Sequence, residues 1–307
     1  SVNTKTSSLS LALLIFSILG QLAAGMLLVL LIVRVYAVRK VGVEKAAQLT
    51  DTPLYMVVLI MILALLASLF HLGKLAHVIG AVPNLASSWL SREVVFAVAF
   101  VIVVGIYALL QWRKVGSEGL RATLGWISAL TGIALVYCMG MAYMLPAQPA
   151  WNTFATPVTF FVTALLLGVL AAATALMLNY AKVQKKDVAL QEFVKSSLQW
   201  IAVAAIILLG IEFLVLPIYL AYLSTQGTAA LHTLNLLVSS YGATLALRLL
   251  LVFAGAGVLA AYLYRNASIA GQEKSLAALA YSAFALVLIS EILGRFLFYA
   301  THYRIGI

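Results

Sequence analysis

The sequence is poor in charged residues and contains a single cysteine. Only 9% of its 307 residues are Asp, Glu, Lys or Arg, and 64% are hydrophobic, whereas a soluble globular domain is roughly 45–50% apolar and about 25% charged. This composition excludes a soluble protein and indicates a polytopic membrane protein. Because Cys138 is the only cysteine, the sequence allows no internal disulfide, no cysteine-ligated cluster and no cysteine-ligated zinc site.

Gly/Ser-rich linkers are absent as well, so we expect one integral membrane domain over residues 1–307. Eight apolar runs reach the roughly 20 residues that a membrane-spanning helix requires. The expected fold is therefore an all-α integral membrane protein in which eight transmembrane helices form a bundle. The runs lie at about 9–33, 53–72, 93–112, 120–145, 157–180, 198–220, 241–264 and 276–300.

Two helix starts carry a local signal. Thr52-Pro53 and Thr156-Pro157 each place a hydroxyl before a proline, which suits an N-cap followed by the first helical position. The longest polar connections are expected at residues 34–52, 73–92 and 221–240.

Basic residues indicate the orientation of the bundle. Lys and Arg gather in the first, third, fifth and seventh connections, within residues 34–45, 113–121, 182–195 and 265–274. The positive-inside rule places these connections in the cytoplasm, so both termini should lie on the outer (periplasmic) side of a bacterial cytoplasmic (inner) membrane. The net charge of +10 is mostly this topological signal, and no nucleic acid partner is expected.

Residues 70–95, FHLGKLAHVIGAVPNLASSWLSREVV, form a polar strip between two apolar runs. Ionisable groups near hydrocarbon are costly and often functional, and this strip holds His71, Lys74, His77, Arg92 and Glu93. Gly73 and Pro83-Asn84 break the backbone between the two runs. The end of the second span and the start of the third can therefore face one pocket.

His71 and Glu93 together suit the oxidation of a hydroquinone. That reaction releases two protons with two electrons, so the site needs a hydrogen-bond acceptor on a quinol hydroxyl and a nearby base, which a neutral imidazole and a half-buried carboxylate can supply. A structural interpretation also exists. Ser91 resembles an N-cap that would place Glu93 in the first helical turn, where the helix dipole stabilises a carboxylate, and His71, Lys74 and Arg92 could simply reach the interface.

The remaining ionisable residues favour structural roles. All four histidines fall on the predicted outer side and none lies in mid-membrane, so haem b held by two imidazoles is not expected. Glu291 and Arg295 are spaced to pair with each other on one helix. Glu212 and Arg248 can pair across helices and brace the second half of the bundle, or carry protons if they face a wet cavity.

Several motifs resemble a known family. Phe70-His71-Leu72-Gly73, then Asn84-Leu85, Ser87-Ser88 and Leu90-Ser91-Arg92-Glu93 are similar to the second-to-third-helix region of the membrane anchor subunit of the dimethyl sulfoxide reductase family. Thr156-Pro157, Phe160-Phe161 and Gly168 resemble its fifth-helix entrance. The eight-span layout with outer termini covers essentially the whole chain.

The resemblance implies a respiratory complex of three subunits. A molybdopterin subunit would perform the terminal reduction, a subunit with four iron–sulfur clusters would carry electrons, and this haem-free anchor would oxidise menaquinol without itself reducing the terminal acceptor. His71 and Glu93 map to the family's quinol site and are the expected catalytic residues. Gly73, Ser91 and Arg92 complete the expected quinol-binding strip, and no metal site is expected.

A secondary transporter is the alternative. Transport favours polar or broken helices near the bilayer midplane, often in matched halves, and Gly210 and Pro217 near Glu212 form the one modest break of this kind. The polar groups gather instead at one membrane edge. This contrast favours the quinol-oxidising anchor.

Overall fold

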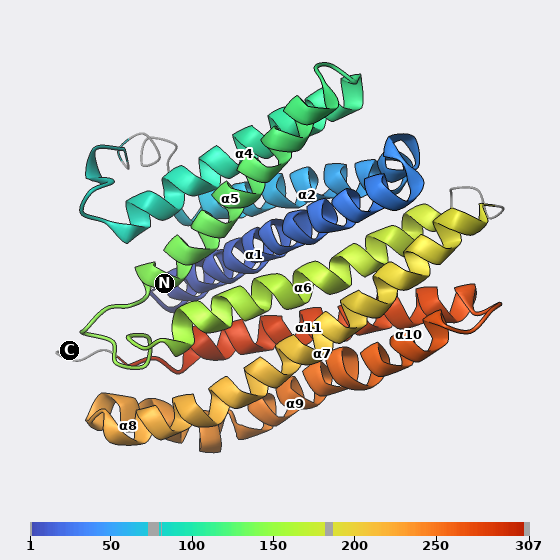
Figure 1. The fold of residues 1–307 in the computed structure, drawn as a ribbon. Helices are drawn as coiled ribbons and strands as arrows, with labels where there is room; N and C mark the ends of the chain where they lie inside the picture. The colour runs from blue at the N-terminus through green and yellow to red at the C-terminus, as the bar shows by residue number, and fades with distance from the viewer. Residues whose placement is uncertain (1, 73–79, 81, 182–186, 304–307) are drawn as a thin grey trace.

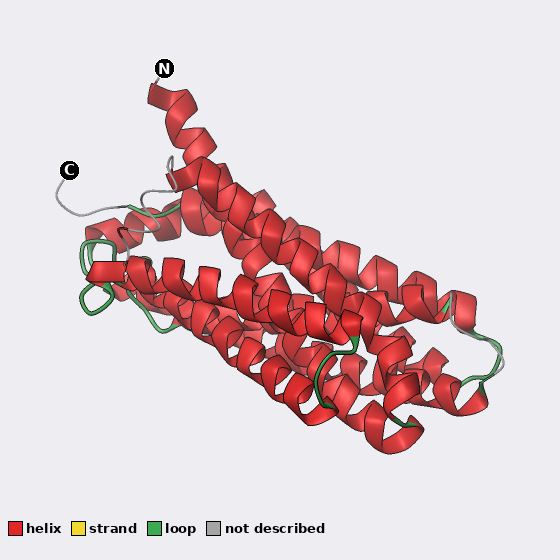
Figure 2. Cartoon of the chain, turned by 90° about the horizontal axis from the view of Figure 1, so that it is seen from above, coloured by secondary structure: helices red, strands yellow, loops and turns green. Residues whose placement is uncertain are grey.

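The chain folds into a helical bundle. The computed structural model describes residues 2–72, 80, 82–181 and 187–303 (Figure 1). These residues contain helices and no strand (Figure 2). Eight of the helical segments are long and apolar enough to cross a membrane, which confirms the number of spans predicted from the hydrophobic runs.

The spans follow one another in chain order. Six spans are single helices before the last two: α1 (Val2–Val41), α2 (Val43–Leu72), α4 (Trp89–Arg113), α5 (Glu118–Ala142), α6 (Ala155–Tyr180) and α7 (Val188–Thr225). The seventh span joins α9 (Gly242–Val252), a π-helix (Phe253–Leu259) and α10 (Ala260–Ala267), and the eighth is α11 (Glu273–Ala300). Shorter elements are a 3₁₀ helix (Val82–Asn84), α8 (Thr228–Asn235) and a π-helix (Leu236–Ser240).

The spans form two groups of four that meet along α1 and α6. One group contains α1, α2, α4 and α5, and the other contains α6, α7, α9–α10 and α11 (Figure 1). In α1 and α6, 78% of the apolar window is buried, against 28–50% in the other six spans. Helix α1 begins and α11 ends at the same end of the bundle (Figure 1), which we call the terminal end.

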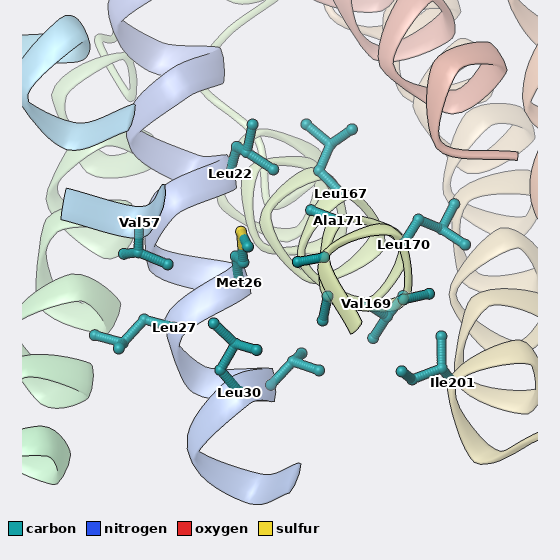
Figure 3. Close-up of a cluster of buried hydrophobic side chains, with 14 of the residues drawn as sticks. Leu22, Met26, Leu27, Leu30, Val57, Leu167, Val169, Leu170, Ala171 and Ile201 are labelled. Atoms are coloured by element: carbon teal, nitrogen blue, oxygen red, sulfur yellow. The ribbon is translucent and has the colours of Figure 1, made fainter. Parts of the chain in front are cut away.

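Two glycines allow α1 and α6 to approach closely. A Cβ added at Gly25 would lie 1.7 Å from the Ala164 carbonyl oxygen, and one at Gly168 would lie 2.3 Å from the Gly25 carbonyl carbon. Small residues at a crossing point permit this backbone contact within a membrane. On either side of the crossing, apolar side chains from α1, α2, α6 and α7 fill the space between the helices, among them Leu22, Met26, Leu170 and Ile201 (Figure 3).

Both helix starts predicted at prolines are wrong, because α2 and α6 each begin before the predicted position. Helix α2 begins at Val43, directly after Gly42, whose φ of +89° makes the turn from α1, so the predicted connection 34–52 is almost entirely helical. Helix α6 begins at Ala155 with Phe154 at the N-cap. The Thr156 hydroxyl donates to the Trp151 carbonyl at 2.8 Å instead of capping the helix.

The predicted connection 221–240 is also largely helical. It contains the end of α7, all of α8 and the π-helix Leu236–Ser240. Its apolar residues Ala230 and Leu237 pack against Trp151 and Leu297, and this tertiary burial outweighs the polar local sequence.

Pro53 lies inside α2 and removes one backbone donor from the helix. The missing N–H would have bonded the carbonyl of Leu49, four residues earlier. The side-chain amide of Asn179, from α6, donates to the carbonyls of Leu49, at 2.9 Å, and Gln48. Asn179 thus satisfies the group that Pro53 leaves free, and a backbone carbonyl without a partner is costly in a membrane.

Replacing Asn179 by Ala is expected to destabilise the protein by about 1–3 kcal/mol, because the Leu49 carbonyl loses its donor in a buried position. In a Pro53→Ala background the same replacement should cost less, since the backbone N–H at position 53 is restored. Thermal unfolding of the four purified proteins measures the difference. An equal loss in both backgrounds would contradict the link between Asn179 and Pro53.

Charged residues at the end opposite the termini form ion pairs. Arg34 of α1 contacts Asp51 of α2 at 3.1 Å and Glu118 of α5 at 2.9 Å, and Lys114 contacts Asp51 at 3.2 Å. In the connection before α7, a hydrogen bond from Lys45 is the main cause that lowers the pKa of Asp187. The basic connections predicted to face the cytoplasm are therefore partly neutralised by acidic neighbours.

Candidate functional site

The polar strip ends at the start of α4, where the structure corrects the predicted cap. The N-cap is Ser88, whose hydroxyl accepts a hydrogen bond from the Ser91 backbone at 3.3 Å. Ser91 is buried and lies within the helix. Glu93 consequently lies beyond the first turn, where the helix dipole no longer accounts for a carboxylate, so the N-terminal structural role considered for Glu93 is wrong.

Glu93 is buried and has no polar partner among the described residues. It is 6% exposed, and no hydrogen bond or ion pair involves its carboxylate among the described residues. Three ionisable side chains lie close enough to interact with Glu93 electrostatically. They are Cys138 of α5, Tyr143 after α5 and Tyr299 of α11. A buried carboxylate without a partner is rare and costly, and such groups cluster at functional sites.

An aromatic cluster lies beside Glu93 at the terminal end of the bundle. The hydroxyl groups of Tyr143 and Tyr299 are 2.7 Å apart, and Trp151 stacks on Phe298 at a ring separation of 5.1 Å. Burial raises the pKa of Tyr143 well above its usual value, and the neighbouring Tyr299 and Glu93 add to the effect. The cluster comprises Tyr143, Trp151, Phe160, Phe298, Tyr299 and His302.

Arg92 holds the loop that precedes α4. Its guanidinium donates to the carbonyls of Leu85, at 2.7 Å, and Ala86, at 2.9 Å, and it lies 4.2 Å from the centre of the Trp89 ring. These contacts fix the loop against the start of the helix. Arg92 thereby ties the loop to the first turns of α4, next to Glu93 in the sequence.

His71 belongs to the last turn of α2, but its side chain lies outside the described part of the protein. Gly73, Lys74 and His77 lie outside the described residues as well. Helices α2 and α4 pack against each other, and the end of α2 and the start of α4 lie at the same end of the bundle (Figure 1). The backbone thus places the segments of His71 and Glu93 at the same end of the bundle, and the shared pocket predicted from the sequence stays a prediction.

The other two histidines have local partners. His302 stacks on Trp151 with ring centres 4.1 Å apart, and its Nδ1 lies 2.7 Å from the Tyr299 carbonyl. Because a carbonyl only accepts, Nδ1 carries the hydrogen. His232 contacts the ring of Tyr303 at 4.6 Å. Among the described residues, no group of three His, Cys, Asp or Glu has the spacing of a metal site.

In the second half of the bundle, one charge pairing was predicted correctly and one was not. Arg248 of α9 pairs with Glu212 of α7, as expected, and also with Glu291 of α11 at 3.1 Å. The predicted pair of Glu291 with Arg295 is wrong. Arg295 instead donates to the Gln21 side chain at 2.9 Å and covers the Phe160 ring, because contacts across helices outweigh the spacing along one helix.

A sequence model of the family described as DMSO reductase anchor subunit (DmsC) matches residues 5–301. The match extends over nearly the whole described bundle. The chain belongs to the DMSO reductase anchor subunit family. Family membership makes it a multi-pass membrane anchor of an oxidoreductase complex, and implies catalytic and electron-transfer partner subunits that hold the cofactors of the complex.

Individual relatives agree with the family match. The protein is 28% identical over 298 residues to one of the chains of anaerobic dimethyl sulfoxide reductase of Escherichia coli (strain K12), an alignment that spans 96% of this chain and 95% of the relative. A relative from Haemophilus influenzae, which is also a chain of anaerobic dimethyl sulfoxide reductase, is 24% identical, and the alignment spans 98% of both proteins. One of the subunits of sulfite dehydrogenase of Allochromatium vinosum is 28% identical over 160 residues, about half of each protein.

Sequence reasoning missed Tyr143 and Tyr299 as neighbours of Glu93. Both lie at span ends on the predicted outer side, where Tyr and Trp are common in any membrane protein. This enrichment of aromatic residues at the membrane interface is the one sequence signal that points to them, and it does not distinguish a site residue from an ordinary interfacial residue. Their proximity depends on how α4, α5 and α11 pack.

Proposed function

We propose that this anchor oxidises menaquinol near the outer membrane face and passes the electrons to an iron–sulfur partner subunit. The observation that carries the proposal is Glu93, which is 6% exposed and has no hydrogen-bond or ion-pair partner among the described residues. It stands beside the aromatic cluster and near the end of α2. A stable fold does not require such a group, whereas a proton-accepting site does.

The chemistry assigns a role to each residue of the strip. Conversion of a quinol to a quinone releases two protons and two electrons. In our proposal the Glu93 carboxylate accepts one proton and His71 holds and deprotonates the other hydroxyl. Ser91, Arg92 and Gly73 would shape the wall of the pocket, Arg92 through its bonds to Leu85 and Ala86. The electrons leave through a partner subunit, which we expect to hold four clusters, to a molybdopterin subunit.

Aromatic rings at the terminal end suit a flat, apolar substrate. The ring centres of Tyr143 and Trp151 are 5.0 Å apart in an edge-to-face arrangement, and aromatic side chains pair favourably with other flat rings. We propose that the ring of menaquinol lies between this cluster and α4. Haem is not among the groups that we propose for this protein.

Loss of this protein is expected to abolish quinol-dependent reduction of the terminal acceptor by membranes, because no other subunit of the proposed complex would bind quinol. The catalytic subunit should still reduce the acceptor with an artificial soluble donor. The measurement compares both activities in membranes and soluble fractions of cells with and without the anchor. Quinol-dependent activity that survives without the anchor would contradict the proposal.

The site should lie on the outer face. Ser87 is exposed in the loop before α4, and Val115, at the opposite end, is 53% exposed. The native Cys138 is buried and gives little background. An impermeant maleimide added to intact cells should label Ser87→Cys when the partner subunits are absent, should label it less when they are present, and should label Val115→Cys only after permeabilisation.

Proton release and consumption on this same face would make turnover electroneutral, so a potential-sensitive dye should report no change during turnover in vesicles. Labelling of Val115→Cys in intact cells would reverse the orientation. A membrane potential generated by turnover would contradict the placement of both reactions on one side.

A further inference from the structure

A buried cluster of charges lies in the second half of the bundle, away from Glu93. The Nη2 atom of Arg248 contacts Oε1 of Glu212 and, at 3.1 Å, Oε2 of Glu291. The three residues come from α9, α7 and α11 and are 8%, 6% and 2% exposed. One guanidinium nitrogen therefore brings two carboxyl groups close together inside a membrane protein.

The groups around the two carboxyl groups come from the neighbouring helices. Helix α6, which packs against it, has no acidic or basic residue and contributes the Thr163 hydroxyl, which donates to Glu291 at 3.3 Å. Arg295 of α11 donates to Gln21 and covers Phe160, and it interacts with Glu291 electrostatically without forming an ion pair with it. Tyr219 of α7 is the other titratable side chain on the adjoining cavity. Both carboxyl groups thus contact the same nitrogen of Arg248, and two carboxylates held side by side in a dry interior do not both ionise readily.

One oxygen of each carboxyl group has no hydrogen-bond partner in the part of the protein that the structure describes. Glu212 Oε2 and Glu291 Oε1 are buried and accept no hydrogen bond from the described residues. If both groups were ionised, two buried anionic oxygens would remain uncompensated, which costs several kcal/mol by general estimates for buried charge. A single proton placed between the carboxyl groups removes one negative charge and supplies a donor.

A cavity extends from Glu212 and Arg248 toward the terminal end of the bundle. It has a volume of about 120 Å³, and its lining includes Glu212, Arg248, Thr159, Tyr219 and Thr301. A site needs only about 10–15 Å³ of such space to admit one water molecule, so the cavity has room for several. Thr301 and Ala150 lie where the cavity reaches the terminal end.

Gly294 makes room for the guanidinium at the centre of the cluster. A Cβ added at this position would lie 2.3 Å from Arg248 Nε. The Ser290 hydroxyl also donates to the Arg248 backbone carbonyl at 2.7 Å. The cluster is thus built by four helices, α6, α7, α9 and α11, and its geometry does not depend on a flexible surface side chain.

From this arrangement we infer that Glu212 and Glu291 together form a proton-binding site, which holds one shared proton at neutral pH and exchanges it with water through the cavity at the terminal end. The step transfers a proton between water and a carboxylate, and no electron moves. The site is separate from Glu93, and the inference holds whether or not quinol is oxidised at Glu93.

Infrared difference spectroscopy of the purified complex tests this inference. The shared proton produces the C=O absorption of one carboxylic acid. Glu212→Gln and Glu291→Gln are each expected to remove this one band, because the remaining carboxylate then pairs with Arg248 and ionises. In wild-type protein the band should shift within minutes of transfer to D₂O. Glu192→Gln, which replaces an exposed carboxylate of α7, is the matched control and should leave the band unchanged.

Thr163→Val provides a gentler variant that preserves the shape of the side chain. Removing the hydroxyl that donates to Glu291 should shift the frequency of the band without removing it. The shared proton would be overturned if the variant-minus-wild-type spectra showed no change in the carboxylic acid region. This holds for the Thr163→Val spectrum and for the spectra of both Gln variants. A band that resists D₂O for hours would overturn exchange through the cavity.

Discussion

Replacing Glu93 by Gln is expected to lower the rate of quinol oxidation about 100-fold or more, in the range typical for loss of a general base, while the complex still assembles. The amide keeps the size of the carboxylate but accepts no proton. Assembly should be preserved because Glu93 makes no hydrogen bond or ion pair among the described residues that the change would break. Steady-state oxidation of a menaquinol analogue by the purified complex measures the effect.

Glu192→Gln serves as the matched control for this prediction, since it removes an exposed carboxylate and should leave the rate unchanged. His71→Ala should reduce the rate in the same way as Glu93→Gln. Wild-type rates in both His71→Ala and Glu93→Gln would remove these residues from the site. A complex that fails to assemble in Glu93→Gln would show that the carboxyl group is structural.

Replacing Gly25 by Ala is expected to produce the largest loss of stability, at or above the roughly 3 kcal/mol that marks the upper end of overpacking costs. The added methyl group would lie 1.7 Å from the Ala164 carbonyl oxygen, and backbone at a helix crossing has little freedom to move away. The two halves of the bundle would have to separate. Thermal unfolding and the yield of assembled complex measure the effect.

Gly105→Ala is the matched control, because an added Cβ at Gly105 of α4 meets no atom within 4 Å. Alanine also favours the helix over glycine, so this variant should be as stable as the wild type or slightly more stable. Equal stability of Gly25→Ala and Gly105→Ala would show that α1 and α6 do not cross at Gly25.

The eight spans were predictable because each depends on a property of its own residues. An apolar run of sufficient length must form a helix in a membrane, since every backbone group needs an internal partner. The positions of helix ends were less predictable. Pro53 was expected to begin a helix, but it lies within α2 because Asn179, from a helix more than 100 residues later, satisfies the carbonyl that the proline leaves free.

Partners within the site were unpredictable for the same reason. The unusual position of Glu93 was visible in the sequence, whereas its neighbours Tyr143 and Tyr299 come from other helices. The i, i+4 spacing of Glu291 and Arg295 suggested a pair. Instead Glu291 pairs with Arg248, and Arg295 donates to Gln21. In a bundle of long helices, the facing helix decides which polar groups meet, and a single sequence does not state which helix that is.

The central claim is that electrons enter the complex from quinol at the site of His71 and Glu93. The most direct measurement is electron paramagnetic resonance of the partner's iron–sulfur clusters after one addition of a menaquinol analogue to the oxidised complex. We predict that the clusters become reduced in the wild type. In the His71→Ala/Glu93→Gln double variant they should stay oxidised, although dithionite still reduces them. Reduction of the clusters by quinol at the wild-type rate in the double variant would contradict the account.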